Sequence, residues 1–227
     1  MPQRRRWESA RTLEGLQDAL LEEPGLFTER TPSLSAPWSE VALAFVDVET
    51  TGLRPEEGDR IVEIAIERVE PDGGTRRFVE IVDPLRSIPE EARRIHAIGP
   101  AQIRRARPFA AAADEIAQLL RGSVWIGHNV AFDIRFIRIE MRRCGRALPG
   151  GWILDTYLLA RRWCRLPHSS LAAVAEHLGH GGRNLHQALD DILTTRAVLA
   201  SLIRKITPAP RTLHDMLSAM IPNKEGS

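Results

Sequence analysis

The amino-acid sequence predicts an α/β fold in which a mixed five-stranded sheet carries helices on both faces. Two observations indicate this class. Three strand-like segments follow one another between residues 41 and 84, which is typical of an antiparallel meander. Further along the chain, two short apolar segments alternate with helical ones, which is typical of strands joined by helical crossovers.

The first three strands are expected at residues 41–49, 59–70 and 75–84. The first reads VALAFVDVE, and the second, DRIVEIAIERVE, alternates apolar and polar side chains as a strand with one buried face does. Only the turn-forming residues Pro-Asp-Gly-Gly at 71–74 separate the second strand from the third. We therefore expect the second and third strands to form a hairpin.

The second half of the chain is predominantly helical. Helical segments are expected at 89–95, 100–105 and 108–120, followed by a short apolar strand at 123–128. That strand leads into a helix at 131–145, which Gly145 ends. A fifth strand at 152–156 precedes helices near 156–164, 170–178 and 187–205, and residues 213–220 have the pattern of one more short helix.

Two flanking segments adjoin the expected main domain. Within residues 7–21, Leu13, Leu16, Ala19 and Leu20 recur at helical spacing, and residues 24–37 are rich in Pro and Ser, as a connector is. This pattern suits a helix that packs on the domain and one that meets a partner equally well. We expect an extension and linker at 1–37, the main domain at 38–205 and a tail at 206–227.

Composition limits the broad class of the protein. The 227 residues are 43% hydrophobic and 27% charged, as in ordinary globular proteins, and no apolar run approaches the roughly 18 residues that span a bilayer. The basic N-terminus lacks the apolar region of a secretory signal. Cys144 and Cys164 lie far apart in the sequence and do not form a disulfide framework, so we expect both to be inert thiols. This cysteine content favours a reducing cytoplasm.

Charge says little about partners. The formal net charge is only +1, although arginine clusters at 104–107, 142–143 and 161–162 could form local positive patches. A GC-rich genome that favours arginine codons explains the same clusters, so charge alone does not predict nucleic-acid binding.

Two acids interrupt the apolar run of the first expected strand. Successive side chains of a strand alternate between faces, so Asp47 and Glu49 share one face while Val46 and Val48 bury the other. Two neighbouring carboxylates repel each other unless a cation lies between them, and oxygen ligands suit Mg²⁺ or Mn²⁺. Two solvated acids on an edge strand would give the same pattern.

Further acids follow in comparable positions. Asp133 lies in the expected first turn of the helix at 131–145, with Asn129 as a candidate cap, and it could simply complement the helix dipole. His186 and, five residues later, Asp191 open the last long helix. Taken alone, these two residues could be a capping histidine and a solvated acid.

Together these segments resemble the DEDDh 3′–5′ exonucleases of the ribonuclease-H-like superfamily, which include the proofreading epsilon subunit of bacterial DNA polymerase III. FVDVETTGL resembles the first motif of that family, HNVAFD the second and HQALDD the third. IVEIA, IHAIGPAQI and LDTYLLAR agree as secondary marks, and the resemblance covers about residues 40–203. It implies a ribonuclease-H-like fold.

The resemblance also implies a two-metal phosphodiesterase site. The four acidic ligands of the family correspond to Asp47, Glu49, Asp133 and Asp191, which would hold two Mg²⁺ or Mn²⁺ ions, with Asp47 bridging them. His186 corresponds to the general base that takes a proton from the attacking water. The family spacing of five residues from the histidine selects Asp191 over Asp190. The expected products are 5′-nucleoside monophosphates, released stepwise from a 3′ end.

Substrate contacts are implied in the same way. Thr50, Thr51, Gly52 and Leu53 match the turn that contacts the terminal nucleotide, with Leu53 against its base and Gly52 allowing close approach of the backbone. Positions that line the substrate cleft in the family match the following residues: His96, His128, Asn129 and Phe132. Phe132 could equally be a core residue.

Substrate and partner are less narrowly defined. The first motif resembles that of the polymerase-associated DNA branch of the family more than that of the oligoribonucleases, which implies single-stranded DNA in proofreading or repair. An RNA-trimming exoribonuclease of the same family is the alternative. A DNA polymerase or a repair complex is the expected partner, although the tail contains no clear clamp-binding peptide. Two other hypotheses are a binding module without catalysis and a zinc site formed by His177, His180 and His186, for which no cysteine lies close.

Overall fold

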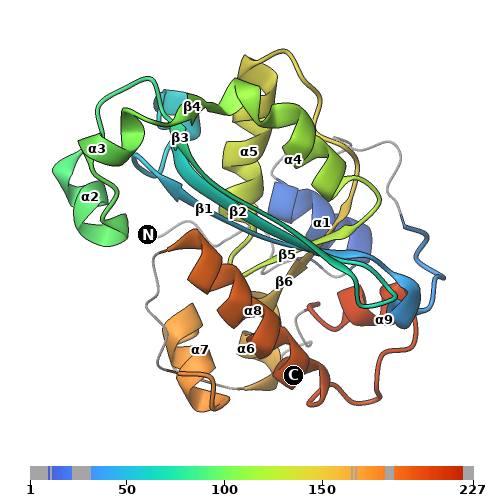
Figure 1. Ribbon diagram of the computed structural model, residues 1–227. Coiled ribbons are helices and arrows are strands. Elements are labelled where there is room, and N and C mark those ends of the chain that lie inside the picture. The colour runs from blue at the N-terminus through green and yellow to red at the C-terminus, as the bar shows by residue number, and fades with distance from the viewer. Residues whose placement is uncertain are drawn as a thin grey trace.

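A mixed sheet of six strands forms the centre of the computed structural model (Figure 1), which describes residues 10, 12–21, 32–164, 166, 168–181 and 187–221. The strand order is β4-β3-β2-β1-β5-β6. The strands are β1 (Leu43–Thr50), β2 (Ile61–Val69), β3 (Thr75–Asp83), β4 (Arg107–Pro108), β5 (Val124–Gly127) and β6 (Trp152–Asp155). β1, β2 and β3 are antiparallel, whereas β5 pairs in parallel with β1 and β6.

The fold class predicted from the sequence is confirmed, but the strand count was one too low. The additional strand, β4, has two residues and pairs in parallel with the end of β3. The sequence analysis placed Pro108 at the start of a helix. β4 is too short to show an alternating pattern, and its proline is tolerated because β4 lies at an edge of the sheet.

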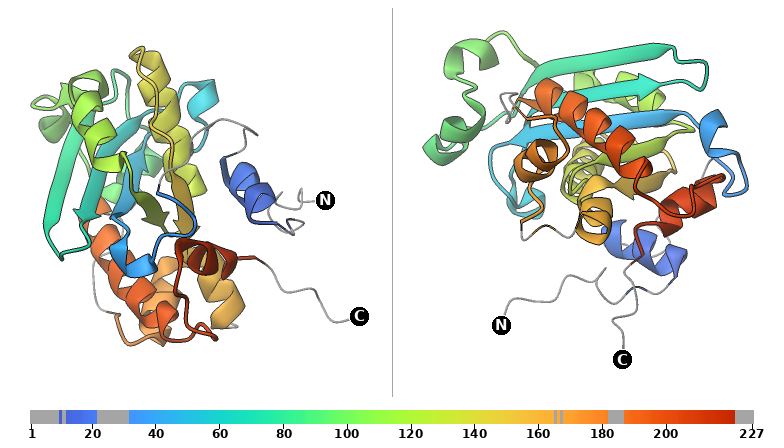
Figure 2. Two further views of the ribbon diagram at one scale, coloured as in Figure 1. Left: turned by 90° about the vertical axis from the view of Figure 1, so that its right-hand side faces the viewer. Right: turned by 90° about the horizontal axis from the view of Figure 1, so that it is seen from below.

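Helices cover both faces of the sheet, as Figure 2 shows. One face carries α4 (Ala113–Leu120) and α5 (Ala131–Arg143), and α1 (Leu13–Leu21) packs beside α5. The other face carries α8 (Ala188–Ile203), flanked by α6 (Thr156–Trp163) and α7 (Leu171–His177). The short helices are η2 (Trp38–Glu40), η3 (Pro55–Glu57), α2 (Glu90–His96), α3 (Pro100–Ile103), η4 (Phe109–Ala111) and α9 (Leu213–Ser218).

The alternation expected along β1 is confirmed. Val46 and Val48 are buried, at 2% and 5% exposure, whereas Asp47 and Glu49 are partly exposed. β1 is central, with β2 on one side and β5 on the other. The two acids therefore occupy a central strand rather than an edge strand, on the face where α8 packs.

The described parts of both flanking segments belong to the same hydrophobic core as the main domain. Leu13, Leu16 and Leu20 of α1 are buried, as are Leu213 and Met216 of α9. The two segments also meet, since the N–H of Leu213 donates to the carbonyl of Ala36 at 2.9 Å. The structure thus places α1 on the domain. None of the helices in the described part of the chain has the length and apolar character needed to cross a membrane.

A buried glutamine of α1 caps the edge of the sheet. β6 is an edge strand, and its Ile153 would otherwise leave a backbone N–H and a carbonyl without partners. Gln17 is fully buried, and its amide donates to the Ile153 carbonyl and accepts from the Ile153 N–H, both at 2.8 Å. One side chain therefore satisfies both backbone groups, as a neighbouring strand would.

Replacing this amide should destabilise the whole domain. In Gln17→Leu two buried backbone groups of β6 lose their partners, and we expect the free energy of unfolding to fall by about 2–4 kcal/mol. Urea denaturation measures the change. Glu14→Gln, on the exposed side of the same helix, is the control and should change stability by less than about 0.5 kcal/mol. Equal stability of the two variants would contradict the capping role of Gln17.

Candidate active site

Three carboxylates meet where β1 ends. Oxygen atoms of Asp47, Glu49 and Asp191 all lie within 4.8 Å of one another. Asp47 and Glu49 share a face of β1 because they are two positions apart, with only Val48 between them. Asp191 arrives from the first turn of α8, which packs on that same face. The adjacent Asp190 does not belong to this group.

A fourth carboxylate, Asp133, lies behind the cluster at the start of α5. It is 5% exposed, and its Oδ1 accepts a hydrogen bond from the backbone N–H of Val48 at 3.0 Å. β5 pairs with β1 only as far as Phe45, so this part of β1 has no strand partner on that side. Asp133 therefore satisfies the backbone of the strand that carries Asp47 and Glu49, and it raises the pKa of Asp47.

Burial and mutual repulsion raise the proton affinity of these acids. The pKa of Asp47 lies well above its usual range, first because the side chain is desolvated and then because Asp133, Asp191 and Glu49 repel its charge. Desolvation, Asp191 and Glu63 raise the pKa of Glu49 from 4.5 to about 7. Because the donors are all carboxylate oxygens, the group fits a hard divalent cation such as Mg²⁺ or Mn²⁺.

The sequence analysis did not single out two further acids at this site. Glu63 of β2 lies directly opposite Glu49, and its Oε2 accepts from the N–H of Ala188 at 3.1 Å. Asp155, 2% exposed, accepts from the N–H groups of Asn129 and Tyr157. Burial raises the pKa of Asp155 to about 6. The segments IVEIA and LDTYLLAR contain these acids, but only the strand register and the β5–α5 connection show where they point.

The turn after β1 is held by a dense set of hydrogen bonds. The hydroxyl of Thr50 donates to the Gly52 carbonyl at 2.5 Å, and the hydroxyl of Thr51 accepts from the N–H of Arg60 at 3.0 Å. A Cβ at Gly52 would lie 2.3 Å from the Asp59 carboxylate, so any other residue there would have to displace the Asp59 side chain. Leu53 projects from this turn with 73% exposure.

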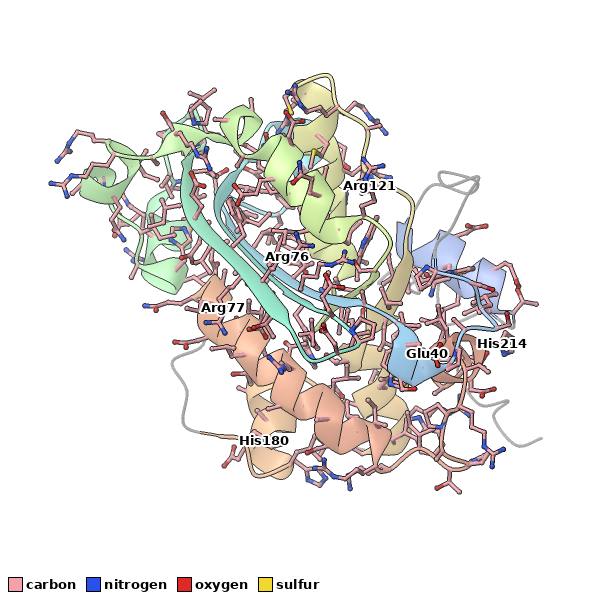
Figure 3. The ribbon with its side chains drawn as sticks, turned by 45° about the vertical axis from the view of Figure 1, so that its right-hand side comes forward. Glu40, Arg76, Arg77, Arg121, His180 and His214 are labelled. Carbon is pink, nitrogen blue, oxygen red and sulfur yellow. The ribbon has the colours of Figure 1, made fainter. Side chains whose placement is uncertain are left out.

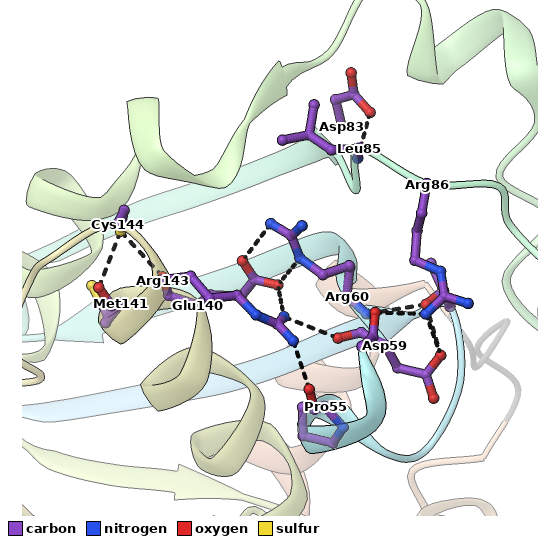
Figure 4. Close-up of polar contacts among 12 residues, drawn as sticks. Pro55, Asp59, Arg60, Asp83, Leu85, Arg86, Glu140, Met141, Arg143 and Cys144 are labelled. Atoms are coloured by element: carbon purple, nitrogen blue, oxygen red, sulfur yellow. Dashed lines mark hydrogen bonds and ion pairs between the residues drawn. The ribbon is translucent and has the colours of Figure 1, made fainter.

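Helix α5 braces the same loop, as Figure 4 shows. Glu140, with 2% of its side chain exposed, accepts two hydrogen bonds from Arg60, at 2.5 and 2.9 Å. Arg143 donates to Glu140 at 2.9 Å and to the carbonyl of Pro55 at 2.6 Å. The helix that carries Asp133 therefore also fixes the loop that presents Leu53.

Two of the other predicted contact residues are engaged within the protein. Both ring nitrogens of His128 have partners, the Thr156 hydroxyl at 3.0 Å and the Ser169 carbonyl at 2.6 Å. Burial lowers the pKa of His128 to about 4, so the ring is neutral at pH 7. His96 is 4% exposed; its Nδ1 accepts from the N–H of Ile98, and its Nε2 is buried without a hydrogen-bond partner.

Three further residues predicted for the site, Phe132, Asn129 and His186, differ in where they lie. Phe132 packs against Phe136, with ring centroids 4.9 Å apart, and is partly buried against the core. Asn129 is exposed, with a positive φ of 69°. The expectation that Asn129 caps α5 was wrong: Val130 is the N-cap residue, because the left-handed conformation of Asn129 turns the chain from β5 into the helix. His186 lies outside the described residues.

Histidines do not join the metal-type cluster within the described part of the chain, where its members are all carboxylates. His180, labelled in Figure 3, has its Nε2 2.8 Å from the hydroxyl of Ser201. Cys144 and Cys164 are free thiols. The described histidines thus give no support to the zinc hypothesis.

The fold and the cluster together define a ribonuclease-H-like α/β protein with an acidic site at the end of its central strand. A family model described as "Exonuclease" (RNase_T) matches residues 44–199. The chain therefore belongs to this exonuclease family. The match contains Asp47, Glu49, Asp133 and Asp191.

Curated relatives are identical to this chain at about a third of the aligned residues. The 3′–5′ exonuclease DinG of Bacillus subtilis is 32% identical over 166 residues, which are 73% of this chain and 18% of that protein. The DNA polymerase III subunit epsilon of Rickettsia felis is 33% identical over 183 residues, 78% of each chain. The chain thus spans less than a fifth of the first relative and most of the second.

Solved structures show the same fold. Escherichia coli exonuclease I in complex with a dT13 oligonucleotide matches with a TM-score of 0.64 at 21% identity, over 74% of this chain and 42% of that one. Exonuclease X in complex with 5′ overhanging duplex DNA matches with a TM-score of 0.59 at 27% identity, over 78% of this chain and 99% of that one.

The raised pKa of Glu49 predicts a stability that falls with pH. Since the folded state binds this proton more tightly than the unfolded state, its stabilising effect is complete below pH 4.5 and is lost as the pH rises to about 7. In EDTA at about pH 8, Glu49→Gln should therefore melt about 2–4 °C above the parent chain, a difference that shrinks toward about pH 5. Thermal unfolding monitored by circular dichroism measures this. Parallel pH profiles for the two proteins would contradict it.

Proposed function

We propose that this chain is a divalent-metal-dependent 3′–5′ exonuclease that releases 5′-nucleoside monophosphates from the 3′ end of single-stranded DNA. The observation that carries the proposal is the carboxylate group of Asp47, Glu49 and Asp191 at the end of β1, with oxygens within 4.8 Å of one another. Family membership supports the reaction class, and two similar proteins are named as a 3′–5′ exonuclease and as a polymerase III epsilon subunit.

The carboxylates would hold Mg²⁺ or Mn²⁺. Asp47, Glu49, Asp133 and Asp191 form an all-oxygen donor set whose mutual repulsion raises the pKa of Asp47, and a bound divalent cation would relieve that repulsion. When bound, a pair of divalent ions neutralises charge on the phosphate, activates the attacking water and stabilises the leaving 3′-oxygen. The protein would contribute by holding the carboxylate oxygens in place. β1, α5 and α8 carry these side chains from three directions.

The turn after β1 would receive the terminal nucleotide. Its backbone is fixed by Thr50, Thr51 and Asp59, and the 73% exposed Leu53 offers an apolar surface for a base. Since an unpaired base exposes both faces while a paired base is stacked in a duplex, this arrangement favours a frayed or single-stranded end. His128 and Asp155 would act indirectly, by shaping the β5–α5 connection that leads to Asp133.

His186 is proposed as the general base. It lies two residues before Ala188, the first residue of α8, and therefore close in sequence to Asp191. Histidine suits this role because the reference pKa of an imidazole, about 6.5, lies near neutral pH.

DNA is the preferred substrate in this proposal, and RNA is the alternative. Two solved structures of similar fold hold DNA, a dT13 oligonucleotide in exonuclease I and a 5′ overhanging duplex in exonuclease X. Similarity to an epsilon subunit over 78% of each chain supports a polymerase or repair complex as partner. A cytoplasmic location, in keeping with the two free thiols, belongs to the same proposal.

Digestion of labelled strands tests the reaction and the substrate together. Single-stranded DNA and RNA, each labelled at either the 3′ or the 5′ end, are incubated with Mg²⁺, with Mn²⁺ or with EDTA. We expect mononucleotide release from the 3′ end of DNA that stops in EDTA. Activity in EDTA, or release of longer products, would exclude the proposed reaction. Faster digestion of RNA would select the exoribonuclease, and binding without digestion would select a non-catalytic module.

Replacing one acid of the cluster, and one acid just outside it, tests whether the cluster is the catalytic site. Asp47→Asn should lower kcat at least about a thousandfold, because the cations lose a charged ligand, while the protein stays folded. Asp190→Asn is the matched control, since Asp190 lies next to Asp191 but outside the cluster, and it should stay within about threefold of the parent chain. Initial rates on 3′-labelled DNA and circular dichroism measure both. Full activity of Asp47→Asn would refute the site.

A further inference from the structure

Helix α8 is fastened to strand β2 at two points, each through a glutamate. Glu63 accepts from the backbone N–H of Ala188, the first residue of α8, at 3.1 Å. Glu67, which is fully buried, accepts from the guanidinium of Arg196, further along the same helix, at 2.8 Å. Arg77 of β3 also donates to Glu67, and Figure 3 shows Arg77 on the side of the sheet that faces α8.

The distance between the two contacts is nearly the same along β2 as along α8. Glu63 and Glu67 are four residues apart in a strand, which is about 13 Å. Ala188 and Arg196 are eight residues apart in a helix, which is about 12 Å. Both pairs of partners can therefore be joined at once only when α8 lies along β2 in one longitudinal position.

The Glu63 contact replaces a cap that α8 lacks. Gln187 is the N-cap residue of α8, and its side chain makes no capping hydrogen bond. The first N–H groups of a helix need partners from outside the helix, and a carboxylate there also complements the helix dipole. Glu63 provides this partner from another element, one turn away from Asp191.

Glu63 is placed beside the cluster rather than in it. It lies opposite Glu49 in the β1–β2 register, yet the group whose oxygens gather within 4.8 Å, among the described residues, comprises Asp47, Glu49 and Asp191. Glu63 adds to the repulsion that raises the pKa values of Asp47 and Glu49, so its presence here needs a compensating role. The hydrogen bond to Ala188 provides that role.

We propose that Glu63 is a positioning residue, which fixes the first turn of α8 and thereby places Asp191 beside Asp47 and Glu49. Glu67 and Arg196 anchor the same helix away from the site. The consequence for catalysis rests on the proposed function, whereas the placement of α8 does not.

Three variants separate this role from the alternatives. Glu63→Ala removes the acceptor, and Glu63→Gln keeps an amide oxygen for Ala188 but removes the charge. Arg196→Met is the matched control, because it releases the far anchor while Arg77 still neutralises Glu67. Amide hydrogen exchange followed by NMR reports on Ala188 directly. Its exchange should speed up about tenfold or more in Glu63→Ala and stay near the parent rate in the other two variants.

Kinetics on 3′-labelled DNA give the second readout. We expect Glu63→Ala to lower kcat about tenfold or more with little change in KM, and Glu63→Gln to restore most of it. Arg196→Met should keep kcat within about threefold of the parent even if its melting temperature falls, because the Glu63 contact still fixes the first turn of α8. A kcat for Glu63→Ala equal to that of the parent overturns the proposal. A loss as large in Glu63→Gln as in Glu63→Ala also overturns it, because charge rather than position would then matter.

Calorimetric titration with Mn²⁺ keeps the test independent of the proposed reaction. If the parent chain cleaves no nucleic acid, the proposed function fails, but misplacement of Asp191 should still weaken Mn²⁺ binding about tenfold in Glu63→Ala and much less in Glu63→Gln. Unchanged Mn²⁺ affinity in Glu63→Ala, or unchanged exchange at Ala188, overturns the positioning role.

Discussion

Repulsion between carboxylates at the end of β1 is the constraint on which the arrangement of this protein depends. Asp47, Glu49 and Asp191 are held within 4.8 Å of one another, and Asp133 lies buried behind them. Burial and mutual charge raise the pKa values of Asp47 and Glu49 rather than lowering them, so the cluster opposes folding at neutral pH. The rest of the fold must therefore hold these side chains in place, and stability is traded for a site that suits divalent cations.

Three elements hold the acids, each through the backbone or a buried side chain. β1 presents Asp47 and Glu49 as part of a central strand. α5 contributes Asp133, whose bond to the N–H of Val48 ties the helix to that strand, while α8 brings Asp191 and is fastened to β2 by Glu63 and Glu67. Because backbone N–H groups cannot move without the element that carries them, these contacts transmit the rigidity of the sheet to the cluster.

The surface beside the cluster is held by some of the same elements as the cluster itself. α5 carries Asp133 at its start and Glu140 in its third turn, so one helix positions both the acidic site and the loop with Leu53. His128, expected near the substrate, also joins parts of the scaffold, because its two ring nitrogens contact Thr156 and Ser169. Far from the site, Gln17 closes the sheet edge at β6, and α1 with the tail completes the core.

The sequence by itself determined the fold class and the order of most elements, because alternation along a strand and helical periodicity are local patterns. It also singled out Asp47, Glu49 and Asp191, which the structure brings together. It also indicated the two-faced pattern of β1. Only the tertiary structure decided that Asp133 lies behind the cluster and bonds to β1, that Glu63 faces Glu49, that β4 is a strand and that α1 covers an edge. Strand register, helix position and the covering of sheet edges are set by contacts between residues distant in sequence. Local sequence patterns do not predict such contacts.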